Sequence, residues 1–288
     1  ASSVIMKRLI VSLIALVMLG VFPNIQAQDV LDGIYQPEHT LERRVIPYSP
    51  LREADIMWLQ RVWRRIDLRE KINHPFYYPE EAVQGRKSLF DVIKDAILND
   101  GTLTAYNPGA LGDDDMFTQR MTTDEVKGLL FRKDTNFTEN LITGEMEQVI
   151  VPIETKSSEI KWYEVKEEWF FDRQRSVMEV RVIGLCPMKA VKDELTGEFR
   201  GLSKLFWIYY PEARYVFVKS EVFNRGNDVE RRTYEDIFWK RQFGSYITKT
   251  SNVYDRKVEQ YKKGLDALLE AEELKEKIFR MEHDLWSY

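Results

Sequence analysis

The middle of the chain, residues 131–223, consists largely of short segments rich in valine, isoleucine and aromatic residues. In the segment SVMEVRV, the apolar Met178, Val180 and Val182 alternate with charged residues. This alternation is typical of an antiparallel strand with one buried face. Two similar Thr-Gly sequences, LITGE at 141–145 and ELTGE at 194–198, indicate hairpin turns. Further strand-like segments are EQVIVPIE, EIKWYEV, SKLFWIYYP and RYVFVKSEVF.

Helical patterns flank this central region on both sides. Residues 49–74 lie between a start signal at Ser49-Pro50 and a stop at Pro75, and they carry apolar residues at helical spacing: Ile56, Leu59, Val62, Trp63 and Ile66. Shorter helices are predicted at 88–101, 122–131 and 233–247. The order of elements predicts an α+β protein with an N-terminal helical region, a central antiparallel β-sheet with hairpins, and C-terminal helices.

The last helix, predicted from about Leu265, carries a narrow apolar seam on a charged background. Its members follow one another at spacings of 4, 3, 4, 3 and 4: Ala267, Ala271, Leu274, Ile278, Met281 and Leu285. A seam of this width suits a helix with one packing partner. That partner is either the rest of this chain or a neighbouring chain, and the sequence leaves both open.

The N-terminus resembles a secretory signal peptide. Lys7 and Arg8 precede an apolar run that ends near Phe22, and a cleavage-like sequence reaches Ala27. The run is shorter than the ~20 residues that a membrane-spanning helix needs, although an uncleaved anchor remains the alternative. We therefore expect four parts: a cleavable signal peptide at 1–27, an extended arm at 28–48, an α+β domain at 49–260 and a charged C-terminal helix at 261–288. The arm is either disordered or laid across a neighbouring subunit.

Charge and cysteine content exclude some classes of protein. The chain has 42 Lys and Arg against 47 Asp and Glu, a net charge of −5, and loss of the basic signal peptide makes it more acidic. This argues against nucleic acid as the main partner. With a single cysteine, Cys186, no intramolecular disulfide can form, and the apolar surroundings indicate a buried thiol.

Candidates for catalysis are sparse. The three histidines, His39, His74 and His283, are scattered, and no zinc-hydrolase, serine-hydrolase or phosphate-loop motif is present. Asp113 to Asp115 lack the alternating spacing of a calcium-binding loop, so we predict that they form a solvated loop. One acidic group surrounds Trp169 and could serve a carbohydrate- or peptidoglycan-active enzyme as acid and base: Glu164, Glu167, Glu168 and Asp172.

Tryptophan and arginine are interleaved in two segments of a chain that is 12% aromatic. These residue types dominate protein interfaces because they bury large areas and form planar hydrogen bonds. The candidate interface residues are Trp58, Arg61, Trp63, Arg64, Arg65, Trp239 and Arg241, together with Leu274, Ile278, Met281 and Leu285 of the terminal seam. Packing inside the chain's own core is the alternative for each of them.

Two blocks of sequence resemble a known family. ADIMWLQRVWRRIDLREKINHPFYYP at 54–79 and YEDIFWKRQFGSYITKTSNVYDR at 234–256 are similar to signature blocks of the GldN/PorN family of Bacteroidetes. The run from Ile66 to Lys71 followed by Asn73-His74-Pro75 is specific, and GLCPMK at 184–189 stands in the expected order. The charged helix after about Lys262 has no clear match.

The resemblance implies a non-catalytic structural component of the gliding-motility and type IX secretion machinery. Such a protein is periplasmic, associated peripherally with the outer membrane, and self-associates within a ring. Its partners are a GldK/PorK-type outer-membrane lipoprotein and a GldM/PorM-type inner-membrane motor component. The resemblance implies no cofactor, no nucleic acid and no small-molecule substrate. The competing hypotheses are the enzyme that uses carboxylates near Trp169, and a monomeric binding module for a small ligand.

Overall fold

The computed structural model describes residues 42–285 except residues 84, 111, 140–145, 194–196, 225, 228 and 229. The predicted signal peptide and most of the predicted arm therefore lie outside the described residues. The turn LITGE and most of ELTGE lie outside them as well.

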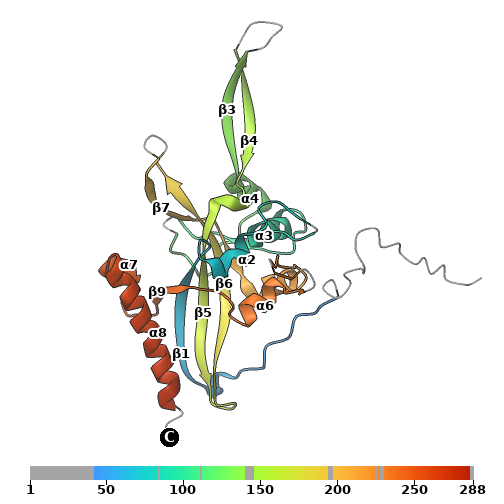
Figure 1. Ribbon diagram of the computed structural model, residues 1–288. Helices are drawn as coiled ribbons and strands as arrows, with labels where there is room; N and C mark the ends of the chain where they lie inside the picture. Colours follow the sequence, from blue (N-terminus) through green and yellow to red (C-terminus); the bar gives the residue numbers. More distant parts are fainter. Residues whose placement is uncertain are drawn as a thin grey trace, which may run out of the picture. The chain divides into compact units, whose positions relative to one another are not determined.

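A seven-stranded antiparallel sheet forms the centre of the structure, in the order β2-β8-β6-β5-β1-β9, with β7 paired to β6. Its three long strands, β1, β5 and β6, run side by side (Figure 1). The bounds are β1 Ile56–Asp67, β2 Ala105–Tyr106, β5 Ile160–Asp172, β6 Val177–Lys192, β7 Phe199–Lys204, β8 Trp207–Tyr209 and β9 Tyr246–Thr250. The predicted α+β class with a central antiparallel sheet is confirmed.

The predicted helix at 49–74 is wrong, because residues 56–67 form β1 in the interior of the sheet. This strand pairs with β5 along its whole length and with β9 from Val62 to Arg65. Five consecutive residues, Val62 to Ile66, are buried. A strand covered on both faces shows no alternation, so its apolar positions matched a helical spacing by chance.

Seven helices are described: α2 His74–Tyr77, α3 Leu89–Leu98, α4 Thr123–Leu130, α5 Tyr210–Phe217, α6 Tyr234–Trp239, α7 Val258–Tyr261 and α8 Leu265–Leu285. The predicted helices at 88–101 and 122–131 are confirmed as α3 and α4. Ser88 caps α3 by accepting the Asp91 backbone N–H, and Thr122 forms a capping box with Glu125 at the start of α4.

Two further predictions are wrong in part. RYVFVKSEVF was expected to be a strand, but its first residues belong to α5, where Pro211 stands in the first turn and Tyr210, Ala213 and Phe217 are buried on one side. The helix expected at 233–247 ends at Trp239, and its last residues form β9. Arg241, with a backbone φ of 52°, lies at this break.

Strands β3 (Phe131–Glu139) and β4 (Met146–Glu154) confirm the strand prediction for EQVIVPIE. Among the described strands, they pair with each other and with no other strand. They form a two-stranded hairpin that extends from the end of α4 (Figure 1).

The main hydrophobic core joins α3, α5 and α6 to the sheet. Aromatic rings fill much of it: the Phe238 centroid lies 5.2 Å from that of Phe76, 5.6 Å from that of Phe243 and 6.0 Å from that of Phe217. A separate small cluster holds Trp63, Tyr106, Cys186 and Trp207. Cys186 is a buried free thiol as expected, and burial raises its pKa well above the ordinary value.

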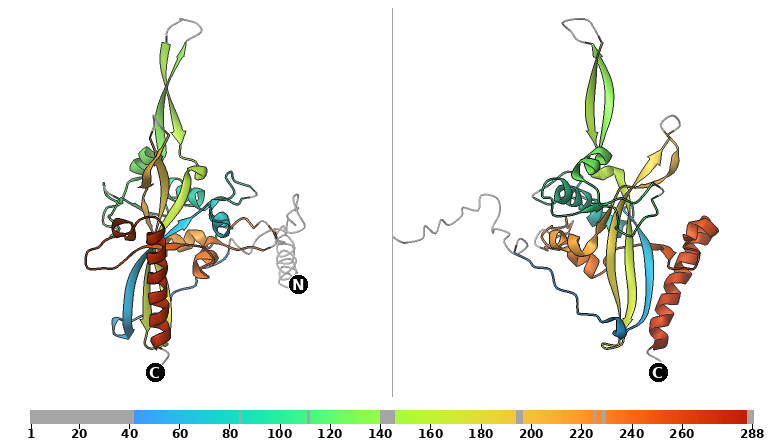
Figure 2. Two further views of the ribbon diagram at one scale, coloured as in Figure 1. Left: turned by 60° about the vertical axis from the view of Figure 1, so that its left-hand side comes forward. Right: turned by 180° about the vertical axis from the view of Figure 1, so that it is seen from behind.

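The terminal helix α8 runs alongside β1 (Figures 1 and 2). Ala271 and Ile278 of the predicted seam are buried against Val62 and Ile247, and Leu274 packs at the margin of the same cluster. The seam therefore has a partner within the chain itself. Within the described part of the chain, no helix is both long and apolar enough to cross a membrane.

Candidate functional site

Three of the predicted interface residues lie inside the fold. Trp63, Arg64 and Arg65 are all less than a tenth exposed. The Trp63 indole N–H donates to Asp115 at 2.6 Å, and Arg64 donates to the side chain and carbonyl oxygens of Ser245 at 2.9 and 3.0 Å. Burial lowers the pKa of Arg64, while Glu167 acts in the opposite direction. These side chains hold the sheet together and leave little surface for a partner.

The loop predicted to be solvated is tied to the rest of the fold by two of its aspartates, Asp115 to the sheet and Asp113 to the start of α7. Lys166 donates to the backbone carbonyl and side chain of Asp115 at 2.6 and 3.1 Å, and Lys257 pairs with Asp113 at 2.5 Å. Burial lowers the pKa of Lys166, and the nearby Asp115 opposes that shift. Across the described residues, no group of three or more His, Cys, Asp or Glu side chains is arranged to hold a metal ion.

Arg61, Trp239 and Arg241 lie nearer the surface. Arg61 pairs with Glu168 at 2.5 Å, and Arg241 makes two hydrogen bonds to Glu167. Trp239 stacks on Tyr48 with ring centroids 5.6 Å apart, yet remains 46% exposed.

The carboxylates around Trp169 are arranged as structural ion pairs. Glu167 and Glu168 are adjacent in β5, so they point to opposite faces of the sheet and cannot act on one scissile bond. Glu167 is fully buried beneath Arg241. The two remaining acids are also paired, Glu164 with Lys204 and Asp172 with Arg175. This arrangement stabilises the sheet and does not resemble a glycosidase acid and base facing across a cleft.

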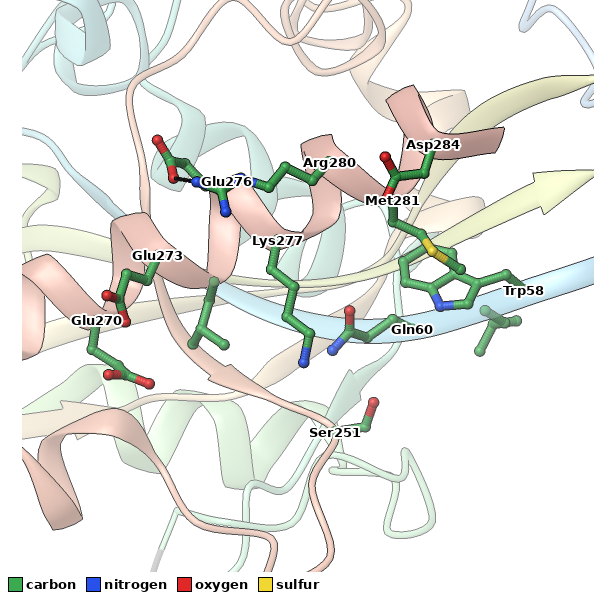
Figure 3. A pocket seen from close by; sticks show the side chains of 12 residues that line it. Trp58, Gln60, Ser251, Glu270, Glu273, Glu276, Lys277, Arg280, Met281 and Asp284 are labelled. Carbon is green, nitrogen blue, oxygen red and sulfur yellow. Dashed lines mark hydrogen bonds and ion pairs between the residues drawn. The ribbon is translucent and has the colours of Figure 1, made fainter. Parts of the chain in front are cut away.

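A groove of about 840 Å³ separates α8 from β1. Its lining includes three predicted interface residues, Trp58, Leu274 and Met281. Figure 3 shows the Trp58 ring beside Met281, and the Lys277 side chain pointing from α8 toward Gln60. The groove therefore has an apolar floor at one end and polar groups along its length.

Acidic side chains dominate the α8 wall of this groove. Four acids line it against two bases: Glu270, Glu273, Glu276 and Asp284 against Lys277 and Arg280. Arg280 already donates to Glu276 at 2.8 Å on the same helix, and Lys262 pairs with Glu270 at 2.7 Å. Glu273 and Asp284 remain in the lining against Lys277. The wall thus presents a negative surface to whatever enters the groove.

The opposite wall is an edge of β1. Strand β9 covers β1 only from Val62 to Arg65, and the Ser251 backbone N–H extends this pairing to the Arg61 carbonyl at 2.9 Å. Among the described residues, no strand pairs with the same edge from Ile56 to Gln60. Backbone groups alternate in direction along a strand. The N–H and C=O of Leu59 therefore point the same way as those of Arg61, toward the groove.

A second depression, of about 640 Å³, lies among β7, β9 and the loop near Gly109. It is lined by several cations and aromatic rings, but its cations are matched by acids. Arg65 pairs with Glu259 at 2.7 Å, and Lys204 with Glu164. This depression is therefore a weaker candidate than the groove beside α8 for binding a charged ligand.

The fold and the groove define an α+β protein with a candidate surface for binding another chain. A family model described as gliding motility associated protein GldN matches residues 51–287. The chain belongs to this family and is therefore a protein associated with gliding motility and its secretion machinery. The match includes the charged helix after Lys262 that the sequence resemblance had left unassigned. No match was found among the curated proteins.

Sequence reasoning did not find the groove itself. It selected Trp58 for its residue type, but placed it on a helix, and it selected Leu274 and Met281 for their place in the apolar seam of the terminal helix. The available signal was the difference in length between the 12-residue β1 and the 5-residue β9. Among the described strands, this difference leaves one edge of β1 uncovered from Ile56 to Gln60.

Proposed function

We propose that this protein is a non-catalytic structural subunit of the gliding and type IX secretion machinery. It acts in the periplasm after removal of a signal peptide at 1–27, and it is associated peripherally with the outer membrane. Its partners are a GldK/PorK-type outer-membrane lipoprotein and a GldM/PorM-type inner-membrane motor component, and it self-associates within a ring. The arm at 28–48 and the helix at 261–288 flank the body at 49–260.

The observation that carries this proposal is the pairing of the β5 carboxylates. A catalytic acid or base must reach its substrate, whereas Glu167 is fully buried against Arg241 and Glu168 pairs with Arg61 on the other face. The acidic groove beside α8 supplies a surface for a protein partner instead.

The test is complementation of a deletion strain with tagged full-length protein. We expect the wild-type chain to restore secretion and to co-purify with the lipoprotein and motor components in a complex of large mass. Glu168→Gln should also restore secretion, because this change removes a carboxylate that an enzyme would need and breaks only a half-exposed ion pair. Loss of secretion by Glu168→Gln in a normally folded and assembled protein would favour the enzyme. Elution of the wild-type chain as a monomer with no partner would favour a small-ligand binding module.

A further inference from the structure

Among the described strands, none pairs with the edge of β1 from Ile56 to Gln60, and this edge lies beside a groove. A strand edge of this kind is a template for another strand, and native proteins normally cover or shorten it. Here α8 lies alongside but leaves about 840 Å³ between its side chains and residues Trp58 to Gln60. Hydrogen-bonded strands lie about 4.8 Å apart. An extended segment can therefore occupy the groove in direct register with β1.

The two walls differ in what they can recognise. The β1 wall offers the N–H and C=O of Leu59, which would form ladder hydrogen bonds with any extended backbone. The α8 wall offers side chains: four acids and two bases, with Met281 and Trp58 forming an apolar end. In such a site the backbone supplies affinity and the side chains supply selectivity.

We propose that the groove binds an extended segment of another protein, basic on balance, which adds to the sheet as a strand beside β1. The excess of acids on α8 favours lysine and arginine on the side of the incoming strand that faces the helix. A second copy of this chain is disfavoured as the occupant because it carries a net charge of −5. The inference deepens the proposed function, since it specifies how one partner of the assembly binds.

Leu59 allows a backbone-specific test. Leu59→Pro removes an N–H that points to the groove and takes no part in the pairing with β5, and proline is tolerated where the missing N–H faces away from the sheet. Leu59→Ala removes a side chain that is already 46% exposed and keeps the N–H. We expect Leu59→Pro to lose one partner from the tagged envelope complex, together with secretion, and Leu59→Ala to retain both. Thermal melts of both variants check that each remains folded.

Hydrogen exchange in the purified complex gives a second, independent readout. In the isolated protein the Leu59 amide should exchange freely, and in the complex we expect its exchange rate to fall about tenfold or more, equivalent to 1.4 kcal/mol. The Gln60 amide, which points toward β5, should be slow in both states. Leu59 exchanging equally fast in both states would overturn the proposal.

Charge variants test the stated chemistry of the occupant. Glu273→Lys with Asp284→Lys reverses two groove acids and should release the partner. Glu272→Lys with Glu282→Lys makes the same charge change on α8 outside the groove lining and should retain it. Equal release by both pairs would overturn the basic character of the partner strand. Concentration-dependent protection of Leu59 in the isolated protein would overturn the choice of a different chain over a second copy.

The outcomes separate this inference from the proposed function. If wild type, Leu59→Pro and Leu59→Ala all co-purify with the secretion components, the inference fails and the structural role stands. If even the wild-type chain neither co-purifies nor restores secretion, the proposed function itself fails.

Discussion

Arg241 holds Glu167 through two hydrogen bonds, of 2.9 and 3.0 Å, that join the break between α6 and β9 to the middle strand β5. The Trp169 indole N–H donates to the same carboxylate at 3.1 Å, and the guanidinium lies 5.3 Å from the centre of the Trp169 ring. The sequence had offered Arg241 as an interface residue and Glu167 as a candidate catalyst. Their pairing gives both a structural role inside one chain.

Replacing Arg241 by alanine should destabilise the protein because it leaves a fully buried carboxylate without its cation. Loss of one partner of a buried pair costs about 3–5 kcal/mol, and we expect the lower end because the Arg241 side chain is 29% exposed. Arginine and alanine at position 241 would adopt the same positive φ, so the backbone strain is nearly equal in the two proteins and largely cancels. Urea denaturation measures the free energy of unfolding, and adding Glu167→Gln should recover part of the loss. A cost below about 1 kcal/mol would place the pair with ordinary surface ion pairs.

The inward seam of α8 predicts local detachment of the helix. Leu274→Asp with Ile278→Asp places two charges against Val62 and Ile247 in a cluster separate from the main core. We expect α8 to leave the sheet while the remaining domain stays folded. Trypsin should then cut faster at Lys262 and Lys263, and tryptophan emission should shift to the red as Trp58 and Trp169 become hydrated.

The matched control lies on the outer side of the same helix. Leu268 and Leu269 are more than half exposed, so Leu268→Asp with Leu269→Asp should leave cleavage and emission close to wild type. If the inner pair instead unfolds the whole protein in one transition, α8 belongs to the cooperative core.

Two glycines should respond to alanine with opposite signs. A Cβ on Gly184 would lie 2.5 Å from Cζ of Phe117 and 3.2 Å from Cε3 of Trp207, and overpacking of this kind costs about 1–3 kcal/mol. Gly128 lies within α4 with no atom within 4 Å of the added Cβ. Gly128→Ala should therefore stabilise the protein by about 0.5–1 kcal/mol. Thermal denaturation of the two variants tests both signs, and stabilisation by Gly184→Ala would contradict the packing described.

Asp236 should make stability depend on pH in the acid range. Burial would raise the pKa of its carboxyl, but hydrogen bonds from Arg43 and Thr233 outweigh burial and lower it. A lowered folded-state pKa contributes stability that is present above the unfolded value of about 3.9 and is lost as the pH falls through the folded value. Asp236→Asn should cost about 1.5 kcal/mol at neutral pH, and the difference from wild type should shrink below about pH 4.

The partner variant isolates the cause of that pH dependence. Arg43 donates to both oxygens of Asp236, at 2.6 and 2.7 Å. Arg43→Gln should therefore flatten the acid-range loss of stability, as measured by urea denaturation at a series of pH values. An unchanged pH profile would assign the lowered pKa to Thr233 alone.

Elements with strong local signals were predictable from the sequence. Helices α3 and α4 have a capping residue just before the first turn and an apolar face, and both signals lie within a few residues of each other. The alternation in SVMEVRV likewise identified part of β6. In α3 and α4, local hydrogen bonds and one-sided burial agree with the final environment, so short-range reasoning was sufficient.

The residues of the candidate site could not be predicted from local patterns in the same way. Of the predicted interface residues, Trp63, Arg64 and Arg65 proved to be buried because β1 is covered on both faces, and the side chain of Leu285 lies outside the described part of the chain. Trp58 does come together with Leu274 and Met281, although it precedes both by more than 200 residues in the sequence. No local pattern encodes that meeting, because it depends on where α8 returns to the sheet.

By itself, the sequence determined the family, the α+β composition and the helices and strands whose burial is one-sided. Only the tertiary structure decided that residues 56–67 are a strand, since its partner β5 begins about 90 residues further along the chain. It also decided which part of the β1 edge has no partner among the described strands: β9 spans 5 residues against the 12 of β1. A free edge arises from the difference in length between paired strands and from the helix that stops short of covering it, and neither is a property of any one segment.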